Sequence, residues 1–286
     1  MAIFTNQATL SYSNGVTNSN VAVGEVLDVL SGSKTAVMDD YVLNDDVTYV
    51  ISLVNTGSLP ILGLTITDNL GAYPWGPIPT TLYPLTYTPG SVRYYINGTL
   101  QPAPVVVPGP PLVISGINIP ANGNVTIIYE VTANQYAPLG VNSSILNQAV
   151  VSGGGLSTPL NLYETIYTQD VANLTITKSI SPVPVIENGT LTYTFIIQNS
   201  GNTAASLADN VILTDDFDPI LALTSVTFNG APWVEPFNYT YNTLTGLFAT
   251  VPGQITVPPA NYVQDPVTGK WIINPGVSTL IVTGTV

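Results

Sequence analysis

Short segments in which apolar and polar residues alternate recur along the whole chain. They are rich in Thr, Val, Ile and Tyr, and Pro, Gly or Asn-Gly pairs separate them; examples are residues 47–55, 64–70, 125–133, 173–181 and 191–199. A period of two places successive side chains on opposite faces of a β-strand. No long segment has the period of an amphipathic helix. The pattern therefore predicts an all-β protein built from Ig-like antiparallel sandwiches.

The pattern occurs twice. Each copy has a Lys 15 residues before a Tyr, and later an apolar strand that ends in an Asp; these are Lys34, Tyr49 and Asp68 in the first copy and Lys178, Tyr193 and Asp215 in the second. Internal repetition at this length indicates two structural units of one kind. We predict tandem sandwich domains at residues 27–170 and 171–286, preceded by a separate segment, residues 1–26.

The two copies differ in their last strand. The first copy continues into SILNQAVVSGG, residues 144–154, which we interpret as its last strand, whereas the second reaches Val286 without such a segment. The matching Asn-Gln-Ala lies at the other end of the chain, in residues 1–26. We predict that this segment is a donor strand or hairpin, with one face formed by Phe4, Asn6, Ala8, Leu10 and Tyr12.

A sandwich without an edge strand exposes unpaired backbone groups and an open core, and both are costly. We predict that the next molecule supplies the missing strand, by adding its N-terminal strand to the sheet edge of domain 2. Such a contact joins two different surfaces and builds an open filament unless it closes into a ring. The alternative is that residues 1–26 fold back onto their own second domain.

One Lys, one Asp and one Asn per domain fall on the inward faces of these predicted strands: Lys34, Asp68 and Asn147 for domain 1, and Lys178, Asp215 and Asn6 for domain 2. Two chemistries fit such a set. One is a buried Lys–Asp ion pair whose remaining hydrogen bonds the Asn completes. The other is a spontaneous isopeptide bond, in which a desolvated, neutral Lys amine attacks the Asn carboxamide and the Asp carries protons while ammonia leaves.

From about Leu30 to Val286 the chain resembles the conserved-repeat domain (domain of unknown function eleven) of Gram-positive and archaeal surface proteins. The likeness rests on a Lys followed by VTYVISLVNTG, LTITD and ILNQAVV in copy one, and by LTYTFIIQNSG and VILTD in copy two. The resemblance implies Ig-like stalk modules, some with an Asp-assisted Lys–Asn isopeptide bond. Applied to these positions, the resemblance implies a Lys34–Asn147 bond assisted by Asp68. It also implies a bond between Lys178 and Asn6 of a neighbouring molecule, assisted by Asp215.

Composition narrows the possible functions. The chain has no Cys and no His, which excludes disulfides, thiolate catalysis and His-based acid–base chemistry. Lys+Arg is 4 against Asp+Glu 17, a net charge of −13, so nucleic acid and anionic membranes are not expected partners. The acidic pairs Asp39-Asp40 and Asp45-Asp46 have no metal-loop spacing and are interpreted as solvated loops. We predict no metal and no cofactor.

We therefore expect a structural protein rather than an enzyme: a filament subunit that forms a head-to-tail homopolymer on the surface of a cell or spore. The alternative is a cell-surface adhesin or stalk fragment that binds a host or carbohydrate ligand. The N-terminus has no basic region followed by an apolar core, so no signal peptide is predicted. Assembly inside the mother cell, as for a spore appendage, is compatible with that. Prolines interrupt the longest charge-free stretch, so no membrane insertion is predicted.

Overall fold

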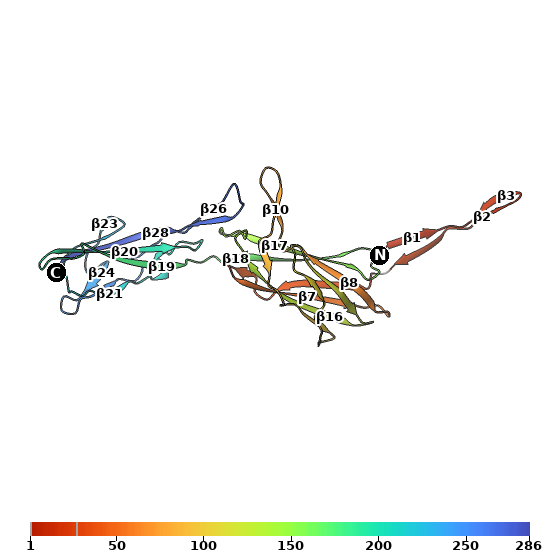
Figure 1. Cartoon of the computed structure of the whole chain (residues 1–286), viewed down its shortest axis with the longest axis horizontal. Helices are drawn as coiled ribbons and strands as arrows, with labels where there is room; N and C mark the ends of the chain where they lie inside the picture. Colours follow the sequence, from red (N-terminus) through yellow and green to blue (C-terminus); the bar gives the residue numbers. More distant parts are fainter. Residues whose placement is uncertain (1, 27) are drawn as a thin grey trace. The chain divides into compact units, whose positions relative to one another are not determined.

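The computed structural model describes residues 2–26 and 28–286 (Figure 1). Residues 1 and 27, the predicted first residues of the donor segment and of domain 1, lie outside the described residues. The all-β prediction is confirmed, because the described elements are strands apart from one 3-10 turn, Leu207–Asp209. The chain forms two compact units. Unit 1 comprises residues 1–138 and 144–167, and unit 2 comprises residues 139–143 and 168–286.

Unit 1 is a sandwich of two antiparallel sheets. The first sheet has the order β13 (Thr99–Gln101), β12 (Arg93–Ile96), β16 (Asn124–Ala133), β7 (Asp46–Asn55) and β5 (Leu30–Ala36), and β11 (Leu85–Tyr87) also pairs with β16. Alternate residues of β7 and β16 are buried, as their period of two predicts. Tyr49, Ile51 and Leu53 are fully buried and form the centre of this face.

The second sheet of unit 1 has the order β14 (Val105–Val107), β15 (Leu112–Ile119), β8 (Ile61–Asp68), β17 (Ser144–Gly153), β18 (Leu160–Thr168) and β6 (Asp40–Tyr41). This corrects one prediction, since residues 144–154 are not the last strand of the domain. After a Gly-rich turn the chain returns as β18, which pairs with β17 along its length. Leu162 and Ile166 of β18 are buried, so β18 also belongs to the core. A two-stranded ribbon, β9 (Tyr73–Trp75) and β10 (Thr80–Leu82), completes the unit.

Unit 2 repeats the first sheet but only part of the second. Its larger sheet has the order β19 (Leu174–Ser181), β20 (Thr190–Asn199), β28 (Gly276–Thr285), β22 (Ala222–Phe228) and β23 (Ala231–Pro232). Its smaller sheet has the order β21 (Thr214–Asp216), β25 (Leu247–Thr250) and β24 (Tyr239–Tyr241), and β26 (Asn261–Gln264) pairs separately with β27 (Trp271–Asn274). Among the described strands none occupies the positions of β17 and β18 beside β21.

The N-terminal segment forms a narrow antiparallel ribbon. β1 (Ala2–Asn6) pairs with β4 (Ala22–Val26), and β2 (Thr9–Tyr12) pairs with β3 (Gly15–Asn18). The pairing is interrupted at Gln7 and Ala8, so the predicted donor strand is two short strands in this structure (drawn in red in Figure 1). Residues 4–14 are all exposed, and Phe4, Leu10 and Tyr12 are 55%, 64% and 59% exposed. The ribbon therefore leaves these three apolar side chains in solvent.

Candidate functional site

Lys34 lies in the interior of unit 1. It belongs to β5, whose pairing with β7 places it opposite Ile51, and its side chain is fully buried. The Nζ atom lies 2.6 Å from Oδ2 of Asp68 and 4.5 Å from the centre of the Tyr49 ring. Burial lowers the pKa of Lys34, and the attraction of Asp68 offsets only part of that effect. This amine is therefore easier to deprotonate than an exposed lysine.

Asp68 is held by donors on both oxygens. At the end of β8, Oδ1 accepts a 2.8 Å hydrogen bond from the backbone N–H of Leu70, and Oδ2 accepts a short hydrogen bond from the hydroxyl of Tyr129. Tyr129 lies on β16 opposite Tyr49, and the two rings stack with centroids 5.7 Å apart. Burial and the nearby Asp68 raise the pKa of Tyr129, so its hydroxyl stays protonated and donates.

Asn147 completes the buried cluster from β17. It is fully buried, and its Oδ1 accepts a 3.3 Å hydrogen bond from the backbone N–H of Gly71. Its Nδ2 is buried and has no hydrogen-bond partner among the described residues. The amide also acts on both tyrosines, where it lowers the pKa of Tyr49 and Tyr129 against the larger effect of burial.

The structure thus brings Lys34, Asp68 and Asn147, all predicted from sequence, into one buried cluster. Sequence reasoning missed Tyr129 and the Gly71 N–H, although the inward parity of Tyr129 in NVTIIYEVTA is a signal for a buried hydroxyl near this site. An amine, a carboxylate and a carboxamide shielded from water can remain an ion pair or condense to an amide. The carbonyl that would be attacked already has one N–H donor.

The corresponding site of unit 2 is open. Lys178 on β19 forms an ion pair with Oδ2 of Asp215 on β21, but the two side chains are 38% and 17% exposed, against 0% and 1% for Lys34 and Asp68. The Nζ atom of Lys178 lies 4.5 Å from the centre of the Tyr193 ring, the same distance as between Lys34 Nζ and the Tyr49 ring. Lys178 is partly exposed in the single chain because no described strand covers it, and the predicted closure of this site by Asn6 of a neighbouring molecule stays a prediction.

Exposure in unit 2 extends along the whole of β19. Leu174 is half-buried, and every later residue of the strand is exposed, including Ile176 at 53% and Ile180 at 46%. The third predicted member of the site, Asn6, is exposed on β1 of unit 1. Unit 2 therefore presents an ion pair and an apolar strand face to solvent.

The two sites also differ in one side chain. In unit 1 Tyr49 faces Tyr129 across the β7–β16 pair, whereas in unit 2 the equivalent residue Tyr193 faces Val282 across β20–β28. Phe217 stacks on Tyr193 instead, with centroids 4.7 Å apart. No tyrosine hydroxyl donates to Oδ2 of Asp215 among the described residues. Lys178 is therefore the ion-pair partner of Asp215 Oδ2 among the described residues, and the Asp215 side chain is partly exposed to solvent.

This contrast predicts different stability effects of the same substitution. Lys34→Met should lower the free energy of unfolding of unit 1 by about 3–5 kcal/mol, because Asp68 is left as an uncompensated buried charge. The matched Lys178→Met substitution should cost unit 2 less than about 1 kcal/mol, since that pair is partly solvated. Denaturant unfolding of each variant, followed by hydrogen exchange to separate the two units, measures both values. Equal losses would contradict the difference in burial.

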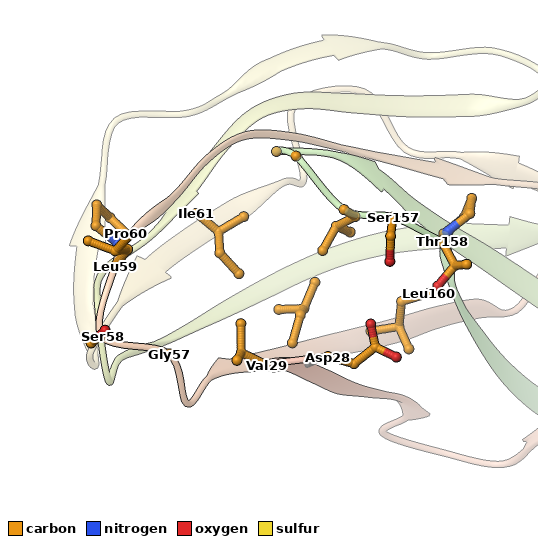
Figure 2. A pocket seen from close by; sticks show the side chains of 15 residues that line it. Asp28, Val29, Gly57, Ser58, Leu59, Pro60, Ile61, Ser157, Thr158 and Leu160 are labelled. Atoms are coloured by element: carbon orange, nitrogen blue, oxygen red, sulfur yellow. The ribbon is translucent and has the colours of Figure 1, made fainter. Parts of the chain in front are cut away.

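A pocket at one end of unit 1 offers no second reactive set. It lies between the β17–β18 turn (Gly154–Leu160), residues 28–30 and residues 57–61 (Figure 2). Asp28 is the single ionisable residue of its lining, so the pocket supplies no paired acid and base. Across the described part of the chain, no cluster of three acidic residues could hold a metal ion, and no helix has the length and apolarity to span a membrane.

No protein-family model matches the sequence, and no curated protein sequence matches it. Solved structures with some likeness include the major pilin subunit of Bacillus cereus, at 9% identity and a TM-score of 0.35, covering 96% of this chain and 73% of that chain. Others are the pilus backbone of Streptococcus pneumoniae (12% identity, TM-score 0.34, 86% and 55% covered) and the collagen adhesin of S. aureus (13%, 0.32, 56% and 55%). The chain thus spans about half the length of the latter two structures. Values this low carry no function from one chain to another.

Proposed function

We propose that this chain is a structural subunit of a self-assembling filament on the surface of a cell or spore. Polymerisation proceeds head to tail, with the N-terminal strand of one subunit completing unit 2 of the next. The observation that carries the proposal is the contrast between two equivalent Lys–Asp sites. β17 and its Asn147 close the first site. The second site is open, and an Asn-Gln-Ala segment lies exposed in the same chain.

The register of unit 1 gives the register of the donated strand. Ala149 pairs with Asp68 across β17 and β8, so Ala8 is expected to pair with Asp215 of the acceptor subunit. Phe4 and Leu10 then take the positions of Ile145 and Val151, which are 2% and 0% exposed. Burial of each large apolar side chain contributes about 1.5–3 kcal/mol. The same step pairs the free edge of β21, which removes a row of unpaired backbone groups.

This contact is heterologous, because the ribbon of one subunit meets unit 2 of another. Each subunit has both halves of the contact, and repetition therefore builds a fibre rather than a closed dimer. The resemblance of both copies to stalk modules of surface proteins supports the same conclusion. A stalk needs resistance to extension, and the chain has no Cys with which to form disulfides.

We further propose that isopeptide bonds lock the filament. In unit 1, the neutral amine of Lys34 attacks Cγ of Asn147, while the Gly71 N–H stabilises charge that develops on Oδ1. Asp68 accepts a proton from the attacking nitrogen and returns it to the leaving Nδ2, so one amide forms and one ammonia departs. Positioning in a folded core supplies much of the lowering of the barrier. Between subunits, Lys178, Asp215 and the donated Asn6 take the same roles.

Charges placed on one face of the donor strand test the polymerisation. The double variant Phe4→Asp/Leu10→Asp should remain monomeric, because two carboxylates would enter an apolar core. The matched variant Thr5→Asp/Thr9→Asp adds the same charge on the opposite face and should still form fibres. Negative-stain microscopy and light scattering distinguish the two outcomes. Fibres from both variants, or from neither, would overturn the assigned face of the strand.

A further inference from the structure

In unit 1 the strand with Asn147 does not act alone. β17 continues through a turn into β18, and the two pair over eight residues, from Ser144–Tyr167 to Val151–Leu160. From this we infer that the element passed between subunits is the whole two-stranded ribbon of residues 2–26, in which the second arm, β3 and β4, takes the position of β18. The inference rests on the proposed function and specifies what is donated.

The order of elements along the chain supports this assignment. Between Asn147 and Lys178 lie a strand, a turn, a returning strand and a short linker that contains Asp170-Val171, over 31 residues. Between Asn6 and Lys34 lie the same elements in the same order, with Asp28-Val29 in the linker, over 28 residues. In the sequence, the N-terminal ribbon therefore precedes Lys34 of unit 1 in the same way that the β17–β18 hairpin precedes Lys178 of unit 2.

β18 contacts β5 in unit 1, and no described strand has that position in unit 2. The methyl Cδ2 of Leu160 lies 3.4 Å from where a Cβ on Gly32 of β5 would be, and Glu164 accepts a 3.1 Å hydrogen bond from the backbone N–H of Ala36. Gly32 lies two residues before Lys34, and Ile176 lies two residues before Lys178, so Ile176 is the counterpart of Gly32 in unit 2. A single donated strand would fill the slot of β17 and leave Ile176 uncovered.

The register of the free ribbon identifies the residue that would cover Ile176. In unit 1 Val151 pairs with Leu160, and in the ribbon Leu10, the counterpart of Val151, pairs with Thr17. Thr17 therefore takes the position of Leu160 and is expected to lie over Ile176 of the acceptor subunit. Val16 points to the other face of β3, and it is 68% exposed in the free ribbon.

Single-cysteine variants test the two arms separately, since the natural chain has no Cys. A mixture of full-length Thr9→Cys and Thr214→Cys chains tests the first arm, because the equivalent residues Val150 and Thr67 are paired in unit 1. A mixture of Thr17→Cys and Ile176→Cys chains tests the second arm, and Val16→Cys with Ile176→Cys is its control. After treatment with a short bis-maleimide, proteolysis and mass spectrometry identify the joined peptides.

We expect the first two mixtures to give cross-links between chains and the Val16→Cys control to give at least tenfold less. Cross-links from Thr9→Cys with Thr214→Cys, together with none from Thr17→Cys with Ile176→Cys, would overturn the ribbon inference and leave strand donation intact. Cross-links from neither mixture, in samples that contain fibres, would overturn both. Because each chain has one cysteine, folding of the ribbon back onto its own unit 2 cannot produce either product.

Discussion

Chains boiled in detergent should run as a ladder of multimers, and the Asn6→Ala substitution should reduce that ladder to a monomer band. The physical reason is that a Lys178–Asn6 amide survives conditions that unfold both units, whereas strand pairing and apolar burial do not. Ala removes the carboxamide carbon that the amine attacks and leaves the apolar face of the donor strand unchanged. Native fibres of Asn6→Ala should therefore persist under the microscope while the ladder disappears on the gel.

Two further variants make this result specific. Lys178→Arg keeps the positive charge but has no amine that can lose its proton to attack, so it should also run as a monomer. Asn20→Ala removes an exposed carboxamide from the same ribbon, outside the predicted Lys site, and should keep the full ladder. A ladder that survives Asn6→Ala would place the covalent contact elsewhere. Wild-type fibres that run as monomers after boiling would show that assembly is non-covalent.

The sequence was sufficient for the strands and for much of the site in unit 1. A period of two assigns each residue to a face, and a Lys, an Asp or an Asn among apolar neighbours on one face is unusual enough to be noticed. Lys34, Asp68 and Asn147 were identified in this way, and the structure places all three in one buried cluster. The repeat added the pairing of Lys with Asp, since both occur at matching positions in each copy.

What the sequence could not supply depends on contacts across strands. Alternation gives the face of a residue but not its neighbour, so the hydrogen bond from Tyr129 to Asp68 required the packing of β16 against β8 of the opposite sheet. The sequence predicts residues 144–154 as the last strand of a domain that extends to residue 170, and it does not predict β18 within that domain. Lys178 is exposed in the single chain because unit 2 has no described strand over that face. The burial of a residue depends on which strands cover its face and not only on its position in its own strand.

The two sites differ in what closes them: folding closes the site in unit 1, and the proposed assembly would close the site in unit 2. Unit 1 contains its own Asn strand, so its site closes as the unit folds and excludes water without a partner. In unit 2, Lys178 and Asp215 are 38% and 17% exposed, and the proposed donation of a ribbon would cover them. In the proposed assembly, the Lys178 site receives its carboxamide, that of Asn6, only with a seated ribbon, so a covalent link would require correct docking.

The bond within unit 1 can be detected by mass. In an Asn6→Ala background, where subunits are not joined, the chain should weigh less than its sequence mass by one ammonia, because Lys34 and Asn147 have condensed. Asp68→Asn should restore the full mass. The substituted amide keeps the shape of the side chain but has one oxygen, so it can accept from only one of the Leu70 and Tyr129 donors. It also cannot accept the proton of the attacking amine. Intact-mass spectrometry of the two purified chains measures the difference directly.

An acid substituted away from the site provides the control. Asp39→Asn makes the same chemical change at an exposed position and should leave the ammonia loss complete. Peptide mapping should then find Lys34 and Asn147 in one branched peptide, which places the loss at this site rather than at another Asn. Full sequence mass in the Asn6→Ala chain would mean that the cluster remains an ion pair. In that case the stability of unit 1 would depend on burial and hydrogen bonding alone, and the covalent proposal for Lys178 and Asn6 would lose its structural precedent.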